Sequence, residues 1–233
     1  MTQPIKFYYD LLSQQCRALY MFLEASKIPY EPIPVSMLKG EHLTENFKNK
    51  VNRLQSVPAI DDHGFKLTQP VAIIRHLVRE KVVPEHWYPR HSLTRSRIDE
   101  FLEWQYNNMR LTSTDYFHTK WLQPALTRSK PNSTEVITVA TERLEECLNE
   151  FQDLWLRGDQ YLIGSNISIA DLLAICEIDQ PKMVGFNPFK NRPKLQDWYS
   201  MVKHTMDHFY VDANQPVMEK FSQDGTNLMS MKA

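Results

Sequence analysis

Ser13 is the side chain of this sequence with the clearest capacity for chemistry. It lies between a short apolar and aromatic run at 5–9 and a helical pattern that begins near Gln14. A serine in that position most often caps the helix, because its hydroxyl accepts a hydrogen bond from the first turn. The first N–H groups and the dipole of a helix also favour negative charge, so the hydroxyl could instead face a bound anion. The local sequence leaves both interpretations open.

Three cysteines are present, and none is predicted to act as a redox group. Cys16 comes three residues after Ser13, whereas a dithiol pair would need cysteine at both positions. The patterns around Cys16, Cys147 and Cys176 favour small, buried, apolar side chains. An odd cysteine count without a secretory signal also predicts a reducing compartment, and therefore a cytoplasmic protein.

Composition and missing motifs argue against several other classes of protein. Apolar residues make up 42% and charged residues 24%, as in a globular chain with a substantial core. The net charge is −1 and no basic stripe is visible, so a nucleic-acid partner is not expected. No GxGxxG, GxxxxGK(S/T) or GxSxG motif occurs, and no acidic or cysteine partner completes a metal set with His204 and His208. No run of about 18 apolar residues predicts a membrane span. We therefore expect no metal and no membrane partner.

The elements that must position Ser13 alternate between strand and helix patterns over residues 1–81. An edge strand is expected at 30–35 because of its prolines, and a tight hairpin at 57–67. Pro70 suits the first turn of a helix. The expected order is β-α-β-α-β-β-α, which predicts a two-layer α/β domain.

The rest of the chain is helical in pattern. Residues 82–92 contain two prolines and no periodicity, so they are interpreted as a linker, and 223–233 as a loose tail. Residues 93–222 are expected to form an all-α domain. Within it, Ser168 and Asp171 have the spacing of a capping box, which marks the start of a helix.

Several stretches taken together resemble the theta-class glutathione S-transferases. The run FYYDLLSQQCRALY at 7–20 carries most of the resemblance, which covers residues 4 to 212 in the family's order. Further support comes from KGEHLT at 39–44, VPAI at 57–60, DEFLEWQ at 99–105 and SIAD at 168–171. The resemblance implies the cytosolic glutathione transferase fold: an α/β N-terminal thioredoxin-like domain followed by an all-α C-terminal domain. It also implies a homodimer.

By this resemblance, Ser13 is the catalytic serine whose hydroxyl donates to the glutathione sulfur and favours the thiolate. Lowering the pKa of a free thiol, ~8.5, by about two units requires ~2.7 kcal/mol. One charge-assisted hydrogen bond and a helix N-terminus together supply roughly that amount. Arg110 matches the arginine that theta enzymes place near the sulfur and the leaving anion.

The resemblance also implies a set of glutathione-binding positions. His42 matches a residue near the glycine end, and Val57 would pair its backbone with the cysteinyl unit in front of a cis Pro58. Asn107 matches a glutathione-side position that varies in the family. The matched positions, including two that depart from the family pattern, are His42, Ser56, Val57, Pro58, Gln69, Pro70 and Asn107.

Two departures affect the predicted glutathione affinity. Gln69-Pro70 stands where the family has Glu-Ser or Gln-Ser, and that serine gives its hydroxyl and N–H to the γ-glutamyl carboxylate. Pro70 has neither donor, at a cost of roughly 1–3 kcal/mol for each. Ser56 stands where a lysine often precedes the Val-Pro pair, which removes a cation near the glycine carboxylate.

The sequence therefore predicts a theta-type glutathione S-transferase with glutathione as co-substrate. It would conjugate the thiolate to small hydrophobic electrophiles such as alkyl halides, sulfate esters and peroxides, in detoxification. The alternative is a non-catalytic theta-like protein with weak or lost glutathione binding, which would act as a carrier of hydrophobic ligands or an interaction module.

Overall fold

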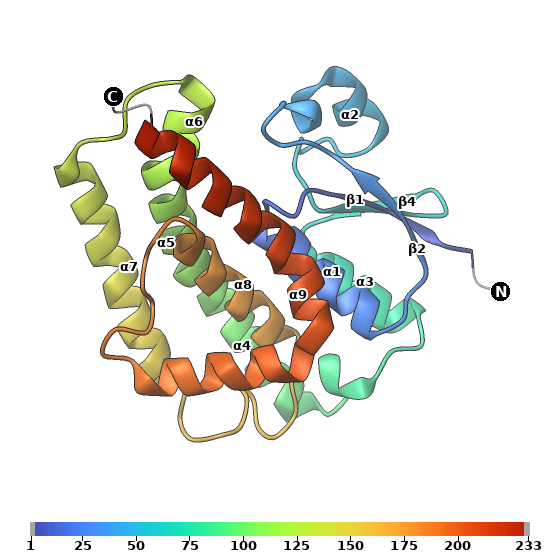
Figure 1. Ribbon diagram of the computed structural model, residues 1–233. Coiled ribbons are helices and arrows are strands. Elements are labelled where there is room, and N and C mark those ends of the chain that lie inside the picture. Colours follow the sequence, from blue (N-terminus) through green and yellow to red (C-terminus); the bar gives the residue numbers. More distant parts are fainter. Residues whose placement is uncertain (1–2, 231–233) are drawn as a thin grey trace. The chain divides into compact units, whose positions relative to one another are not determined.

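The computed structural model describes residues 3–230, except for the side chains of 220 and 222–230. Contacts divide the chain into a first unit, Met1–Tyr88 with Met206–Ala233, and a second unit, Pro89–Thr205. The first unit contains the sheet, and the second is helical (Figure 1).

The first eighty residues form their elements in the β-α-β-α-β-β-α order that the sequence predicts. The sheet has the strand order β2-β1-β3-β4, in which β1 and β2 are parallel and the other two pairs are antiparallel. This is the thioredoxin-like arrangement. The bounds are β1 (Ile5–Tyr9), α1 (Gln14–Ala25), β2 (Tyr30–Pro34), η1 (Glu41–Leu43), α2 (Glu45–Lys50), β3 (Ala59–Asp62), β4 (Phe65–Thr68) and α3 (Pro70–Glu80).

Local sequence explains the edge and the turn of this sheet. β2 carries two prolines and lies at the edge, where a missing N–H need not break a ladder. The β3–β4 hairpin turns at His63 and Gly64, whose φ angles of 55° and 95° are those of a primed two-residue turn. The Val57–Pro58 peptide bond is cis, as the resemblance implies, and lies just before β3. In Figure 1, α1 and α3 lie together against the sheet, and α2 lies on its other side.

Asp62 fixes the β3–β4 hairpin to the end of α3. Its carboxylate accepts from Nζ of Lys81 at 2.9 Å and lies 2.9 Å from Nε2 of His76. Burial alone would raise the pKa of Asp62, but the hydrogen bonds from Lys81 and His76 outweigh that effect and hold this pKa below its ordinary value. The ion cluster is therefore a local source of stability.

We expect Asp62→Asn to lower the free energy of unfolding by about 1–3 kcal/mol at neutral pH, because the half-buried Lys81 and His76 lose their carboxylate partner. Since the folded-state pKa of Asp62 is depressed, its contribution is present above the unfolded-state pKa of about 3.9 and disappears as the pH falls through the folded value. Urea titrations of both proteins at a series of pH values measure this. If the difference in unfolding free energy between wild type and Asp62→Asn stays constant down to about pH 2, the stabilising role of the ionised Asp62 is wrong.

The second unit and the end of the chain are built from helices. α9 is interrupted at Asp207, where φ is 43° and ψ is −120°, so the chain bends there. The bounds are η2 (Glu85–Trp87) in the first unit, then α4 (Ser92–Asn107), α5 (Met109–Phe117), η3 (His118–Leu122), α6 (Gln123–Thr127), α7 (Thr134–Trp155), α8 (Ile169–Met183) and α9 (Pro193–Ser230).

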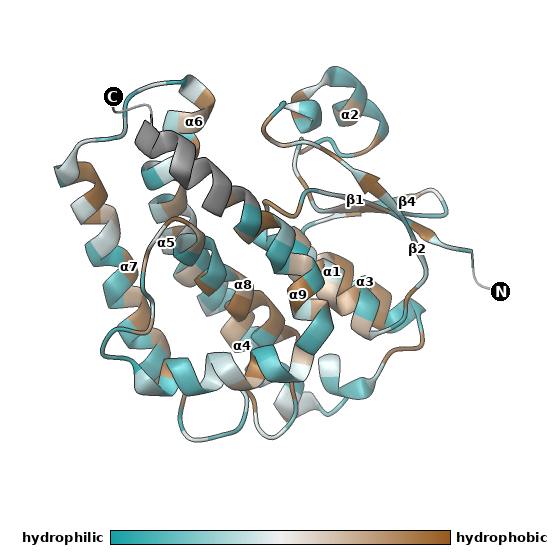
Figure 2. Cartoon of the chain, in the orientation of Figure 1, coloured by the Kyte–Doolittle hydropathy of each residue, from teal (hydrophilic) through white to brown (hydrophobic). Residues whose placement is uncertain are grey.

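α8 is the buried centre of the second unit. All of its residues from Ile169 to Pro181 are buried, and the helix is largely brown in the hydropathy view (Figure 2). The predicted capping box at its start is present: Ser168 N donates to Asp171 at 2.9 Å, and the Ser168 hydroxyl caps the first turn. Asp171 also accepts from Nε1 of Trp198 at 2.9 Å, which ties α8 to α9.

Two boundary regions differ in detail from the sequence expectation. Residues 82–92, expected as a linker, contain η2 with a buried Trp87 and the first residue of α4. The loose tail expected at 223–233 begins inside α9, which continues to Ser230. No proline follows Pro216, and Gly225 lies within the helix although glycine is a weak helix former. Residues 231–233 lie outside the described residues.

Candidate functional site

Ser13 caps α1, as the sequence predicts. Its hydroxyl oxygen accepts from the N–H of Cys16 at 3.4 Å, and the side chain is buried, with 8% of the residue exposed. That bond is long and uses only a lone pair of the hydroxyl oxygen, so the hydroxyl can still donate its proton, either to the neighbouring Cys16 thiol or to a ligand. The geometry thus allows the cap and the anion-facing role at the same time.

The segment 10–13, called here the Ser13 loop, is held in part by hydrogen bonds to Asp10. The Asp10 carboxylate accepts from the N–H of Leu12 at 2.9 Å and from that of Met37 at 2.8 Å. Its backbone carbonyl accepts from the N–H of Ser13 at 2.9 Å. Asp10 therefore joins the end of β1 to the segment that follows β2.

A pocket of about 430 Å³ lies against this loop, within the first unit. It is lined by the end of β1, the start of the Ser13 loop and the segment after β2: Tyr9, Asp10, Leu11, Pro34, Val35, Ser36 and Glu41. The volume is within the usual range for small-molecule sites, roughly 300–1,000 Å³.

Cys16 lies below the loop in a small apolar cluster. It packs with Val35, which follows β2, with Phe47 of α2 and with Val57, which lies two residues before β3. Burial raises the pKa of the Cys16 thiol to about 12, so this sulfur is protonated at neutral pH. The interpretation of Cys16 as a small buried apolar residue is confirmed, and the same holds for the burial of Cys147 and Cys176.

Asn52 brings two of the predicted glutathione-binding segments together. Its side-chain amide donates to the carbonyl of Ser56 at 2.7 Å and to the hydroxyl of Thr68 at 3.1 Å. Thr68 in turn donates to the carbonyl of Pro58 at 3.2 Å. These hydrogen bonds hold the segment 56–58 beside Thr68, the residue before Gln69 and Pro70.

Gln69 and Pro70 form the start of α3. Gln69 is exposed and adopts φ 73° and ψ 118°, a backbone conformation outside the helix that follows. Pro70 is buried at the first helical position, where its fixed φ suits the helix and its missing N–H breaks no intrahelical bond. The proline is thus accommodated by the fold, although it presents no donor to a ligand.

His42 lies in η1, next to the same region. The carbonyl of the neighbouring Leu43 accepts from Nε2 of Gln55 at 2.6 Å, which links η1 to the segment before Ser56. Nδ1 of His42 is buried and has no hydrogen-bond partner among the described residues. Burial lowers the pKa of His42, and the charge of Asp10 opposes that shift only in part.

Two of the predicted site residues, Asn107 and Arg110, belong to the second unit. Asn107 is exposed and donates its amide to the carbonyl of Glu103 at 3.1 Å. Arg110 lies 3.6 Å from the buried carboxylate of Glu177 and 5.8 Å from the ring centre of Tyr106. Nη1 of Arg110 is buried without a hydrogen bond within the described part of the chain.

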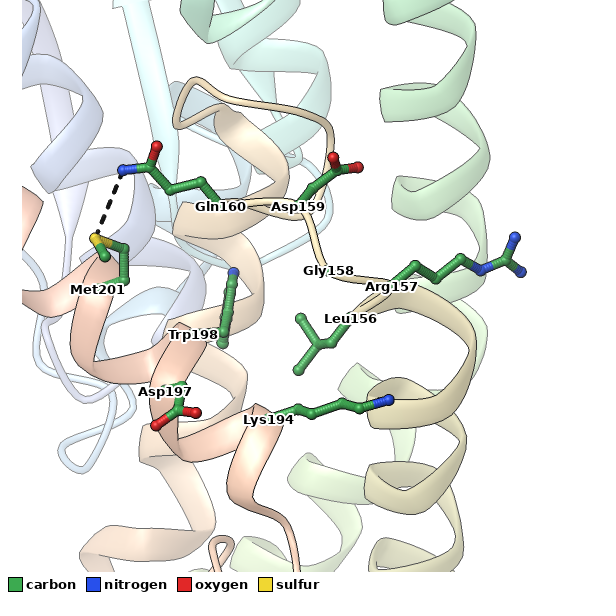
Figure 3. A pocket seen from close by; sticks show the side chains of 9 residues that line it. All are labelled: Leu156, Arg157, Gly158, Asp159, Gln160, Lys194, Asp197, Trp198 and Met201. Atoms are coloured by element: carbon green, nitrogen blue, oxygen red, sulfur yellow. Dashed lines mark hydrogen bonds between the residues drawn. The ribbon is translucent and has the colours of Figure 1, made fainter.

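A separate pocket lies in the second unit, between the end of α7 and the start of α9 (Figure 3). It has a volume of about 370 Å³ and contains none of the predicted site residues. Its lining residues are Leu156, Arg157, Gly158, Asp159, Gln160, Lys194, Asp197, Trp198 and Met201.

Among the side chains that the structure describes, those of 3–219 and 221, no group of three histidine, cysteine or acidic residues is arranged to hold a metal ion. In the same range, no helix is long and apolar enough to cross a membrane.

Family models match both halves of the chain. The model described as "Glutathione S-transferase, N-terminal domain" matches residues 7–79, and that described as "Glutathione S-transferase, C-terminal domain" matches residues 110–204. Among curated proteins, mouse glutathione S-transferase theta-3 is 36% identical over 216 residues, which is 92% of this chain and 89% of that protein. Human glutathione S-transferase theta-1 is 35% identical with the same coverage.

Solved structures give the same family. The apo form of human glutathione S-transferase T1-1 superposes with a TM-score of 0.87 at 35% identity, covering 92% of this chain and 90% of that one. A human theta-class glutathione transferase, in complex with the glutathione conjugate of 1-menaphthyl sulfate, superposes with a TM-score of 0.90 at 27% identity. That comparison covers 97% of this chain and 92% of the other.

Proposed function

Because this chain belongs to the theta class of the glutathione S-transferase family, we propose that it joins glutathione to small electrophiles, with Ser13 holding the reacting sulfur as a thiolate. The observation that carries the proposal is the position of Ser13. Its buried hydroxyl caps the 12-residue helix α1 through a weak bond and keeps a proton to donate. A thiolate is an anion that such a donor, at the positive end of a helix, stabilises.

In the proposed reaction, the glutathione thiol first releases its proton to water, and the thiolate accepts a hydrogen bond from Ser13. The sulfur then attacks an electrophilic carbon: a C–S bond forms, and the bond to the leaving group breaks with its electron pair. Halide and sulfate are suitable leaving groups because both depart as stable anions. We assign Arg110 to the leaving anion, since its Nη1 has an ion-pair partner at 3.6 Å but no hydrogen bond among the described residues.

The remaining positions are proposed to hold glutathione itself. Val57, before the cis bond to Pro58, would pair its backbone with the cysteinyl unit, because the β3 ladder begins only at Ala59. His42 and Ser56 are assigned to the glycine end, and Asn107 to the glutathione side. This assigns glutathione binding to the domain expected at 1–81 and the electrophile pocket to the helical domain expected at 93–222, with 82–92 as the linker, although contacts group residues from Met206 onward with the first unit.

The proposed site offers the fewest hydrogen-bond donors to the γ-glutamyl end of glutathione. Gln69 is exposed, and Pro70 contributes neither of the two donors that a serine would. The N–H groups of Val71 and Ala72, in the first turn of α3, are the backbone donors that remain for a carboxylate. We therefore propose glutathione binding that is weakened, but not lost, at this end.

We also propose that the protein is a cytoplasmic homodimer. Large apolar side chains are exposed on both units, among them Phe65 on β4 in the first and Leu93 and Tyr106 on α4 in the second, as expected for a chain that buries surface against a second copy. Sedimentation of the purified protein tests the dimer. A species of single-chain mass at micromolar concentration would contradict it.

Glutathione binding and turnover together test the proposed function. We expect calorimetry to give a dissociation constant at or below the millimolar range, and 1-menaphthyl sulfate or a benzylic halide to be conjugated in the presence of glutathione. Absence of both binding and turnover in a folded protein would overturn the proposal. Binding of apolar dyes without glutathione binding would instead identify a carrier of hydrophobic ligands.

A further inference from the structure

Arg17 is the largest fully buried side chain among the described residues, with 0% of its surface exposed. A guanidinium is rarely buried in this way unless its hydrogen bonds serve a particular arrangement. Arg17 lies in the first turns of α1, four residues after Ser13. We infer that Arg17 is a positioning residue that holds the Ser13 loop in the shape that presents the Ser13 hydroxyl. This inference rests on the proposed function.

Arg17 donates hydrogen bonds to the carbonyls of the Ser13 loop. Its Nη1 donates to the carbonyl of Leu11 at 2.8 Å and to that of Leu12 at 3.3 Å. Its backbone N–H donates to the carbonyl of Ser13 at 3.1 Å. Three consecutive carbonyls of the loop are therefore bound by one residue.

Asp10 binds the N–H groups of the same loop, whose carbonyls Arg17 binds. The N–H of Leu12 donates to the Asp10 carboxylate, and the N–H of Ser13 donates to the Asp10 carbonyl, both at 2.9 Å. For Leu12 and Ser13, both the N–H and the carbonyl thus have a partner in Asp10 or Arg17. Little freedom is left for the backbone that carries the Ser13 hydroxyl.

Positioning matters here because the proposed catalytic contact is a single hydrogen bond. The strength of such a bond falls steeply as its angle and length depart from the optimum, and small displacements of a reacting group cost rate. A lysine at position 17 would retain the charge but not the planar fork of donors. Arg17→Lys therefore tests the effect of the hydrogen bonds to the loop while the positive charge at position 17 is kept.

The experiment is a double-mutant cycle of Arg17→Lys and Ser13→Ala, read out as the pH profile of kcat/KM. We expect Arg17→Lys alone to raise the apparent pKa of the bound glutathione thiol by about one unit and to lower kcat/KM about tenfold at a pH below that pKa. In the Ser13→Ala background, the same change should have less than about a twofold effect, because there is no hydroxyl left to position.

The outcomes separate the two proposals. If Ser13→Ala itself leaves the profile unchanged, the proposed function of Ser13 fails. If Ser13→Ala acts as expected but Arg17→Lys has the same effect in both backgrounds, or none, the positioning role of Arg17 is wrong.

Arg192 provides the matched control in the second unit. It is also a buried arginine, with 2% of its surface exposed, and its Nη1 donates to the carbonyl of Pro188 at 3.2 Å. Arg192→Lys should lower stability and leave the thiol pKa unchanged. If Arg17→Lys does not fold, Arg17→Gln, which keeps an amide donor, takes its place in the same cycle and is judged by the same outcomes.

Discussion

Ser13→Ala is expected to lower the rate of glutathione conjugation at least tenfold while the protein stays folded. The variant removes the hydroxyl that is proposed to hold the thiolate, and a hydrogen bond to a charged group contributes about 1.5–3 kcal/mol. The cost to the fold is smaller, because the capping bond from Cys16 N–H is long, at 3.4 Å, and helix caps contribute about 0.5–2 kcal/mol. Steady-state kinetics and a thermal melt of the same preparation measure the two effects.

The pH dependence of this variant has a definite sign. Without the hydroxyl, the pKa of the bound thiol should rise toward the value of a free thiol, ~8.5. The loss of rate should therefore be largest below that pH and should diminish as the pH rises through it. Ser26→Ala is the matched control, because Ser26 is buried at the other end of α1. Unchanged turnover in Ser13→Ala, or equal losses in both variants, would remove Ser13 from the mechanism.

The elements that carry the site were predictable from local patterns. The prolines of 30–35 require an edge strand, and β2 lies at the edge of the sheet. The hairpin at 57–67 follows from the turn residues His63 and Gly64, both of which adopt positive φ. In these places the residue type alone restricts the backbone, so no knowledge of distant contacts was needed.

The residues that assemble the site were not predictable in the same way. Asp10 contacts Met37, 27 residues away, and Asn52 contacts Thr68, 16 residues away. An aspartate before a helix and an asparagine in a loop are ordinary local choices, since both side chains commonly satisfy nearby backbone groups. Only the fold shows that these two side chains join segments that are distant in sequence.

The burial of Arg17 was also not predictable from the local sequence. An arginine in the first turns of a helix is ordinarily exposed, and nothing in its neighbours' sequence signals a buried guanidinium. Its burial follows from the path of the Ser13 loop, which returns the carbonyls of Leu11 and Leu12 toward the helix. The roles proposed for Ser13 and Arg110 likewise come from the resemblance to the family, since spacing alone left them open.

Pro70→Ser is expected to tighten glutathione binding by at least tenfold. The substitution restores an N–H and a hydroxyl at the first position of α3, and each donor to a carboxylate contributes roughly 1–3 kcal/mol. Because every 1.4 kcal/mol is tenfold in affinity, a gain of one to four powers of ten is consistent with the two donors. Calorimetric titration of glutathione into both proteins measures the change. The serine variant should be slightly less stable, since proline restricts the unfolded chain.

Pro70→Ala separates the two restored donors, because alanine returns the N–H without the hydroxyl. If both donors reach the γ-glutamyl carboxylate, the alanine variant should lie between the wild type and Pro70→Ser. If the two variants bind equally and better than wild type, the backbone N–H alone accounts for the family's contact. Affinities unchanged in both variants would mean that the carboxylate is held elsewhere, for which the N–H groups of Val71 and Ala72 are the nearest backbone donors in the same helical turn. In that case, Pro70 would be a choice of helix start, and the weakened binding proposed for this chain would be wrong.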